Sequence, residues 1–113
     1  MLGRTGPYRF ADADGGIKVA VGATTVEITS LIAGRRYRVT VAAGGDGAGT
    51  QTGGAVFRWG ADDAASSNGN FDFAIAAGES LEIVAESTTI NVIEMDATSA
   101  ATAAVYFSPI EHA

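Results

Sequence analysis

Residues 31–39 read Leu-Ile-Ala-Gly-Arg-Arg-Tyr-Arg-Val, and residues 75–83 read Ile-Ala-Ala-Gly-Glu-Ser-Leu-Glu-Ile. Both stretches follow one pattern, apolar-x-Ala-Gly-x-x-apolar-x-apolar. Glycine supplies the positive φ or the close backbone approach that a sharp reversal of the chain requires, and the alternation after it is typical of a half-buried strand. Each copy therefore predicts a strand, a corner and a second strand. The two copies enter their corners in different strand phases, so they need not be equivalent.

The variable positions of the two copies carry opposite charges, with Arg35, Arg36 and Arg38 in the first and Glu79 and Glu82 in the second. The same polarity runs through the whole chain. Residues 1–58 hold all seven Lys and Arg against four acidic residues, a net charge of +3, whereas residues 59–113 hold nine acidic residues and no Lys or Arg. We interpret the chain as a dipolar building block, basic at one corner and acidic at the other, that packs against copies of itself or against an acidic partner.

Apolar and polar residues alternate along most of the chain, which predicts half-buried strands. Eight segments are expected as strands, namely residues 17–21, 26–28, 37–41, 57–59, 71–75, 81–83, 90–95 and 102–107. Turn-forming glycines and asparagines separate these segments, and no long segment has a helical stripe. Short strands with such turns predict an all-β fold, an antiparallel β-sandwich of about eight strands.

The first copy also contains Leu-x-x-Gly-x-x-Tyr, which resembles the tyrosine corner of fibronectin type III and immunoglobulin-like sandwiches. This resemblance implies that the Tyr37 hydroxyl bonds to nearby backbone. The only tryptophan, Trp59, lies downstream of the corner, whereas those families bury theirs upstream. Two strand-corner-strand units suit a jelly roll at least as well, so the sequence leaves jelly-roll and immunoglobulin-like topologies open.

Residues 1–16 differ from the rest and are expected to form an extended N-terminal arm, while residues 17–113 form one sandwich domain. The arm carries Tyr8, Arg9 and Phe10 among glycines and a proline. Aromatic residues and arginine are the types that anchor interfaces. An arm that docks on a neighbouring molecule is therefore our expectation, and a frayed terminus is the alternative.

Composition excludes several classes of protein. The chain has no Cys, so disulfides, thiolate metal sites and Cys nucleophiles are excluded. A net charge of −6 argues against nucleic acid as the partner, because phosphate contacts need clustered Lys and Arg. No apolar run is long enough to span a membrane, and the N-terminal residues do not resemble a secretory signal.

No catalytic constellation is evident, and we expect the protein not to be an enzyme. His112, the only histidine, follows Pro109, which we expect to end the last strand, so a catalytic triad or a histidine metal site is implausible. Glu82 and Glu86 are close in sequence, as a glycosidase pair would be, but in a strand they share the face opposite Leu81, Ile83 and Ala85, which we expect to be the solvent face.

Metal and cofactor sites are likewise not expected. Asp12 and Asp14 begin a calcium-loop pattern, but the position of the bidentate acid is occupied by Ala23. Asp62 and Asp63 could supply oxygen ligands to a metal ion, but loops are usually polar because they are solvated, and we expect no site there.

The basic residues of the first copy are the best candidates for a binding role. Arg36 and Arg38 alternate with Tyr37 and Val39, so they project from one face of a sheet, and Arg58 joins them if its strand is adjacent. The predicted interface is completed by Arg35 and by Tyr8, Arg9 and Phe10 of the arm. A merely solvated face is the alternative, because an exposed ion pair contributes only about 0–1 kcal/mol.

Exposed aromatic side chains would instead suit a binding site for sugars. Trp59, Tyr8 and Tyr106 could stack on saccharide rings if they lined one face. Phe57 and Trp59 alternate with a polar residue, so they are more simply interpreted as core residues.

Residues 24–108 as a whole resemble the small structural proteins of tailed bacteriophages, most of all capsid decoration or cement proteins. The resemblance is carried by Phe-Arg-Trp-Gly at 57–60, by residues 71–81 with their Ala-Ala-Gly-Glu-Ser turn, by Thr-Thr-Ile-Asn-Val-Ile at 88–93 and by Val-Tyr-Phe at 105–107. It implies a β-sandwich that is made in the host cytoplasm and joins the virion, where it binds the outside of the capsid without catalysis.

The implied partners are the major capsid protein and further copies of the chain, in a dimer or trimer. The alternative is a glycan-binding or structural module of a phage fibre, tail or adaptor.

Overall fold

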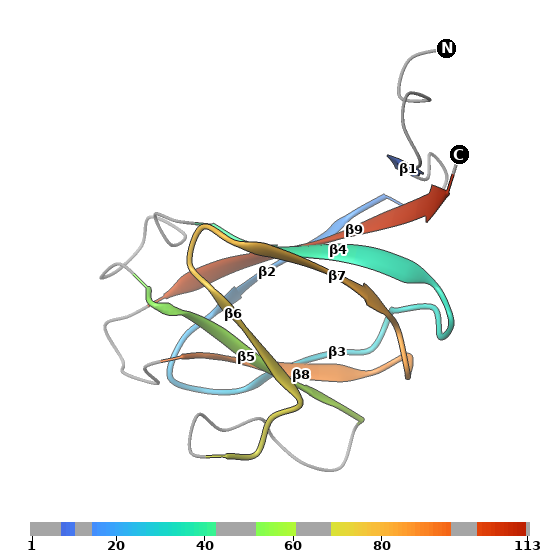
Figure 1. The fold of residues 1–113 in the computed structure, drawn as a ribbon. Coiled ribbons are helices and arrows are strands. Elements are labelled where there is room, and N and C mark those ends of the chain that lie inside the picture. Colours follow the sequence, from blue (N-terminus) through green and yellow to red (C-terminus); the bar gives the residue numbers. More distant parts are fainter. Residues whose placement is uncertain (1–7, 11–14, 43–51, 61–68, 96–101, 113) are drawn as a thin grey trace.

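Two antiparallel sheets pack face to face in the computed structural model, which describes residues 8–10, 15–42, 52–60, 69–95 and 102–112 (Figure 1). Sheet A contains β1 (Tyr8–Phe10), β2 (Ile17–Val21), β4 (Arg36–Val41), β7 (Ser80–Val84) and β9 (Ala103–His112). Sheet B contains β3 (Val26–Ile28), β5 (Gly54–Trp59), β6 (Phe73–Ala76) and β8 (Ile90–Glu94). The predicted all-β antiparallel sandwich is confirmed.

The strand order identifies the topology as a jelly roll. Sheet A runs β2-β9-β4-β7, with β1 pairing to the far end of β9, and sheet B runs β3-β8-β5-β6. Except between β5 and β6, each of the strands β2 to β8 is followed by a strand of the other sheet. Such double-sheet alternation is the arrangement of a jelly roll rather than of an immunoglobulin domain.

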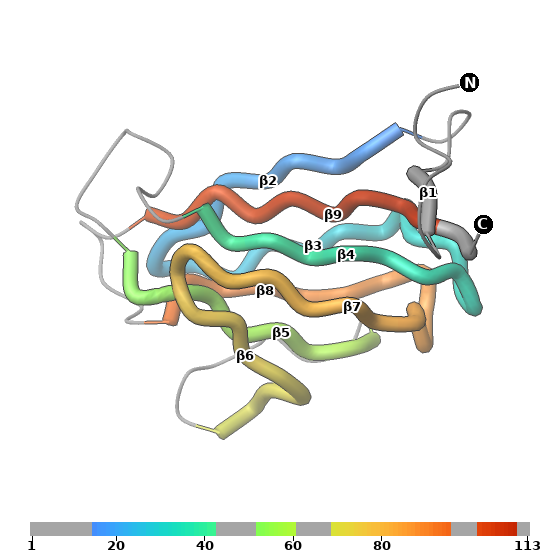
Figure 2. Tube along the Cα trace, turned by 45° about the horizontal axis from the view of Figure 1, so that its top comes forward, coloured from blue at the N-terminus to red at the C-terminus, as the bar shows by residue number. Residues whose placement is uncertain are grey.

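Figure 2 shows the strands of the two sheets as two layers, and the core residues lie between them. β4 shows the alternation most clearly, because Tyr37, Val39 and Val41 are buried while the residues between them are half-exposed. Phe57 of β5 stacks on Phe73 with ring centroids 4.7 Å apart and meets Phe107 of β9 edge-on at 6.1 Å. These aromatic contacts join sheet B to the middle of sheet A.

The two copies of the repeated pattern form two corners, and each corner carries the chain from sheet B to sheet A. The first links β3 to β4 and the second links β6 to β7. Gly34 and Gly78 have φ values of 85° and 86°, in the left-handed region that favours glycine. The Arg35 N–H donates to the Ile32 carbonyl in the first corner. In the second, the Glu79 N–H donates to the Ala76 carbonyl, and both bonds are 3.0 Å long.

The corners also bond to one another's strands in the same way. Gly34 N–H donates to the Ala85 carbonyl and Gly78 N–H to the Val41 carbonyl, both at 2.8 Å. In return, Ala85 N–H donates to the carbonyl of Arg35, as Val41 N–H donates to that of Glu79. An approximate two-fold axis therefore relates the two units. The sequence left open whether the two copies are equivalent, and their backbones are equivalent from the corner onward.

The tyrosine corner is confirmed in the first copy. The side chain of Tyr37 is 3% exposed, and its hydroxyl accepts a 2.9 Å hydrogen bond from the Ile32 N–H. Leu81 occupies the equivalent position of the second copy and is 41% exposed. The two-fold relation thus holds for the backbone and not for this side chain.

Pro109 does not end the last strand, contrary to our expectation. β9 continues through it to His112, with Pro109 opposite Tyr37 of β4. Ala42 N–H donates to the Ala104 carbonyl, so the backbone N–H and C=O groups of even-numbered residues in β9 point toward β4. The backbone groups of Pro109, an odd-numbered residue, therefore point to the other side of the strand. There the pairing with β2 ends at Phe107 and that with β1 begins at Ile110, so the missing N–H of proline falls at a gap.

Part of the expected N-terminal arm belongs to sheet A. Residues 8–10 form β1, which pairs antiparallel with residues 112–110 of β9. Residues 1–7 and 11–14 lie outside the described part of the chain. The arm is therefore joined to the domain by at least one short strand.

Replacing the buried hydroxyl tests the tyrosine corner. Tyr37→Phe removes the acceptor of the Ile32 N–H, and we expect the free energy of unfolding to fall by about 1–3 kcal/mol. Urea denaturation followed by Trp59 fluorescence measures this change. The matched control Tyr106→Phe removes a hydroxyl from a side chain that is 38% exposed and should change stability by less than about 0.5 kcal/mol. Equal effects of the two substitutions would contradict the assignment.

Candidate protein-binding face

The outer face of sheet A, turned away from sheet B, collects the basic and hydroxyl side chains of four strands. Its polar and aromatic members, defined by register and alternation, are Lys18, Arg36, Arg38, Thr40, Ser80, Glu82, Tyr106 and Ser108, and the exposed Val84 lies on the same face opposite Arg36. One row across the sheet runs from Lys18 through Tyr106 and Thr40 to Ser80, and the next runs from Ser108 through Arg38 to Glu82. The face is therefore broad and polar, with one aromatic residue in the middle.

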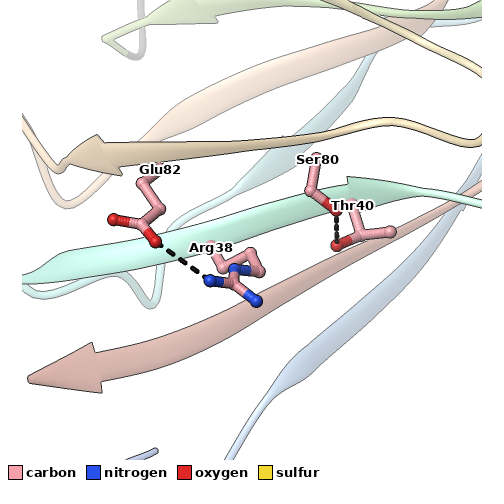
Figure 3. A network of polar contacts seen from close by, with 4 residues as sticks. All are labelled: Arg38, Thr40, Ser80 and Glu82. Carbon is pink, nitrogen blue, oxygen red and sulfur yellow. Dashed lines mark hydrogen bonds and ion pairs between the residues drawn. The ribbon is translucent and has the colours of Figure 1, made fainter. Parts of the chain in front are cut away.

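Two side-chain contacts cross from β4 to β7 on this face (Figure 3). Arg38 Nη2 lies 3.0 Å from Glu82 Oε2 in an ion pair, and the hydroxyls of Thr40 and Ser80 lie 2.7 Å apart. Arg38 and Glu82 are 44 residues apart, hold equivalent positions in the two copies and are direct register partners. The approximate two-fold axis thus passes between them.

This ion pair corrects the interpretation of the chain as a dipolar block. The basic strand and the acidic strand lie side by side in one sheet, and Arg38 meets Glu82 of the same chain instead of an acidic residue of another copy. The opposite charges of the two copies therefore partly neutralise each other within the domain. Their side chains remain 43% and 28% exposed, so the pair is still accessible to a partner.

The placement of the predicted basic residues is mixed. Arg36 and Arg38 project from one face of β4, as expected from their alternation with the buried Tyr37 and Val39. Arg58 does not join them, because β5 lies in sheet B and pairs with β6 and β8. Arg58 alternates there with the core residue Phe57, so it faces the opposite side of the sandwich.

The arm and the corner lie at the same end of sheet A. In the backbone register, Phe10 of β1 and Arg36 of β4 flank Ile110 of β9 from its two sides. Arg35 is half-buried in the corner that leads into β4. The structure therefore brings the predicted residues 8–10 close to Arg36, although their side chains lie outside the described features.

Sequence reasoning missed Lys18, the hydroxyl residues and the central place of Tyr106. The Lys18 Nζ lies 5.8 Å from the Tyr106 ring centroid, within the range of a cation–π contact. Alternation of Lys18 with Ile17 and Val19 was a signal that it faces outward. The position of Lys18 next to Tyr106, however, depends on the register between β2 and β9, which are far apart in sequence.

Trp59 lies elsewhere, as the core interpretation required. It is half-buried, packs against the core and approaches Phe73 with ring centroids 6.1 Å apart. Of the three aromatic residues considered for sugar stacking, Tyr106 is exposed on a sheet face, whereas the side chain of Tyr8 lies outside the described features.

One carboxylate is buried away from this face. Glu94 at the end of β8 has no exposed surface and accepts hydrogen bonds from the Thr52 hydroxyl and the Gly53 N–H. These bonds hold the chain at the start of β5, which indicates a structural role. Within the described ranges, His, Asp and Glu form no group of three that could hold a metal ion.

Searches of protein-family models, of curated proteins and of solved structures found no match to this chain. In the part of the chain that the structure describes, no helix has the length and apolar character needed to cross a membrane.

Exchanging the two charges tests the ion pair at the two-fold axis. Arg38→Glu alone places two carboxylates opposite each other and should lower the free energy of unfolding by about 0.5–1 kcal/mol. The double variant Arg38→Glu with Glu82→Arg restores an opposite pair and should recover most of this loss. Chemical denaturation at low and at high salt measures both. If the double variant is no more stable than Arg38→Glu alone, the pair does not contribute as described.

Proposed function

We propose that the protein is a non-enzymatic structural protein that binds a larger protein assembly through the outer face of sheet A. The observation that carries the proposal is the combination on one face of an exposed tyrosine with Lys18, Arg36 and Arg38. Tyrosine and arginine are enriched among the residues that dominate binding energies at protein interfaces. The surrounding hydroxyls of Thr40, Ser80 and Ser108 supply further hydrogen-bonding groups.

The bacteriophage capsid is the assembly that we propose, from the resemblance of residues 24–108 to decoration proteins. On this proposal the chain belongs to the virion, contacts the major capsid protein and associates as a dimer or trimer. Many copies would bind a repeating lattice, so a modest affinity at each site is reinforced. The jelly-roll sandwich supports this role because it offers broad sheet faces.

The second candidate is a glycan-binding module of a fibre or tail. Tyr106 favours it, since an exposed ring next to Thr40 and Ser108 on a flat sheet could stack on a sugar whose hydroxyls bond to its neighbours. The protein-binding proposal accounts in addition for the two arginines of β4, and we prefer it for that reason.

The binding test uses phage heads assembled from the capsid protein of the same genome without this chain. Purified protein should bind them saturably and raise the temperature at which they disrupt. Lys18→Glu combined with Tyr106→Ala should weaken binding by about ten-fold or more, because an aromatic anchor alone contributes about 2 kcal/mol.

Arg58→Glu on sheet B is the matched control and should leave binding nearly unchanged. Sedimentation of the heads with labelled protein at two salt concentrations measures both variants. Absence of saturable binding would overturn the capsid proposal, and binding to a saccharide panel that Tyr106→Ala abolishes would favour the glycan module instead.

A further inference from the structure

An apolar groove opens at the side of the sandwich, between the edges of the two sheets. It has a volume of about 420 Å³ and is lined by Trp59 of β5, Phe73 of β6, Leu81, Ile83 and Val84 of β7, and Glu86. Leu81 and Ile83 lie opposite Val39 and Tyr37 of β4, so they belong to the inner face of sheet A. Among the residues that the structure describes, the groove is therefore a part of the core layer that is left open.

The groove is bounded by β7, the last strand of sheet A. The hydrogen bonds of Glu79 and Ala85 to the chain of β4 and its corner show that the backbone N–H and C=O groups of odd-numbered residues in β7 point toward β4. The backbone groups of Ser80 and Val84 therefore point away from β4, along the outer edge of the strand. Such an edge is a template for a further strand.

Large apolar side chains are exposed along this edge. Leu81 is 41% exposed on the inner side of the strand, and Val84 is 47% exposed on its outer side, opposite Arg36. An apolar groove next to a strand edge that has no partner among the described strands is typical of an interaction site. The apolar contacts would provide affinity and the backbone bonds would fix the direction and register of the partner.

The charged residues of β7 and of its two ends are acidic. Glu79 precedes the strand, Glu86 follows it and lines the groove, and Glu82 lies on the outer face, where it is paired with Arg38. A second copy that paired through its own β7 would bring these acids together, which is unfavourable across paired strands. A partner with basic residues is favoured instead.

We propose that the groove and the outer edge of β7 bind an extended segment of a partner protein, with apolar residues at alternate positions and Lys or Arg between them. The segment adds to sheet A beside β7. Its apolar side chains, beside Leu81 and Ile83, enter the groove, and its basic side chains lie on the outer face, on the side of Glu82 that is turned away from Arg38. This site shares Ser80 and Glu82 of β7 with the outer face of sheet A, but its groove lies on the inner side of the sheet, so the inference does not depend on the function proposed above.

Two synthetic peptides of alternating sequence serve as probes, one of Val and Arg and one of Val and Glu. The Val–Arg peptide should shift the fluorescence of Trp59, the only tryptophan of the chain, and should slow hydrogen exchange at the amides of Ser80 and Val84. The Val–Glu peptide should do neither at the same concentration. Equal binding of both peptides, or binding without protection of these two amides, would overturn the proposal.

Variants of the groove distinguish binding at this site from non-specific binding of the peptide. Leu81→Ser removes an apolar wall, and Val84→Pro removes an outward N–H at an edge position where proline is tolerated. Each should weaken binding of the Val–Arg peptide at least ten-fold. Ile32→Ser is the matched control, because Ile32 is 47% exposed at the other corner, and should leave binding unchanged.

Circular dichroism checks that each variant is folded. If Val84→Pro does not fold, the binding measurement on Leu81→Ser still tests the proposal. The same three variants are examined by sedimentation of the protein alone. A dimer that Val84→Pro dissociates would show that a second copy occupies the edge and would overturn the proposed basic partner.

Discussion

The antiparallel pairing of β4 with β7, held at both ends by a glycine corner, is the constraint on which the rest of the structure depends. Each corner brings the chain from sheet B into sheet A, and its N–H and C=O groups bond to the strand that follows the other corner. Only a residue that tolerates a φ near 85° can occupy Gly34 or Gly78 without strain. Because the corners fix both the crossing and the register, they also determine which side chains meet on the outer face of sheet A.

The register between β4 and β7 explains how a basic strand and an acidic strand both contribute to the outer face of sheet A. Arg38 and Glu82 meet at the two-fold axis, which partly neutralises the middle of the face and leaves Lys18 and Arg36 near its margins. Tyr106 lies among hydroxyl groups in the adjoining row. The side of β7 away from β4 has a different character, with apolar groups that open into the core layer and acids around them. A single strand thus contributes to two surfaces of opposite chemistry, and this is why we propose a partner for each.

Local sequence patterns predicted the features that depend on neighbouring residues. They did not predict the features that depend on which distant strands pair with each other. Alternation and the repeated Ala-Gly predicted the strands and corners, and Leu-x-x-Gly-x-x-Tyr predicted the hydrogen bond of Tyr37. The sheet to which Arg58 belongs, by contrast, depends on pairing with β6 and β8, and the tolerance of Pro109 depends on where β1 and β2 end along β9. The contact of Arg38 with Glu82 likewise needs a register between two strands that the sequence leaves unspecified. For the candidate site, alternation therefore predicted on which face of a strand each side chain lies, but not which side chains of adjacent strands lie next to it.

Hydrogen exchange at individual amides, measured by NMR on the free protein, tests the two corners most directly. The amides of Gly34, Val41, Gly78 and Ala85 donate the four bonds that join the corners to the opposite strands. The two-fold account predicts that all four exchange far more slowly than the outward-facing amide of Val84, since native hydrogen bonds must open before exchange. If Gly34 and Ala85 exchange as fast as Val84 while Gly78 and Val41 are protected, or the reverse, the two corners are not equivalent and the account is contradicted.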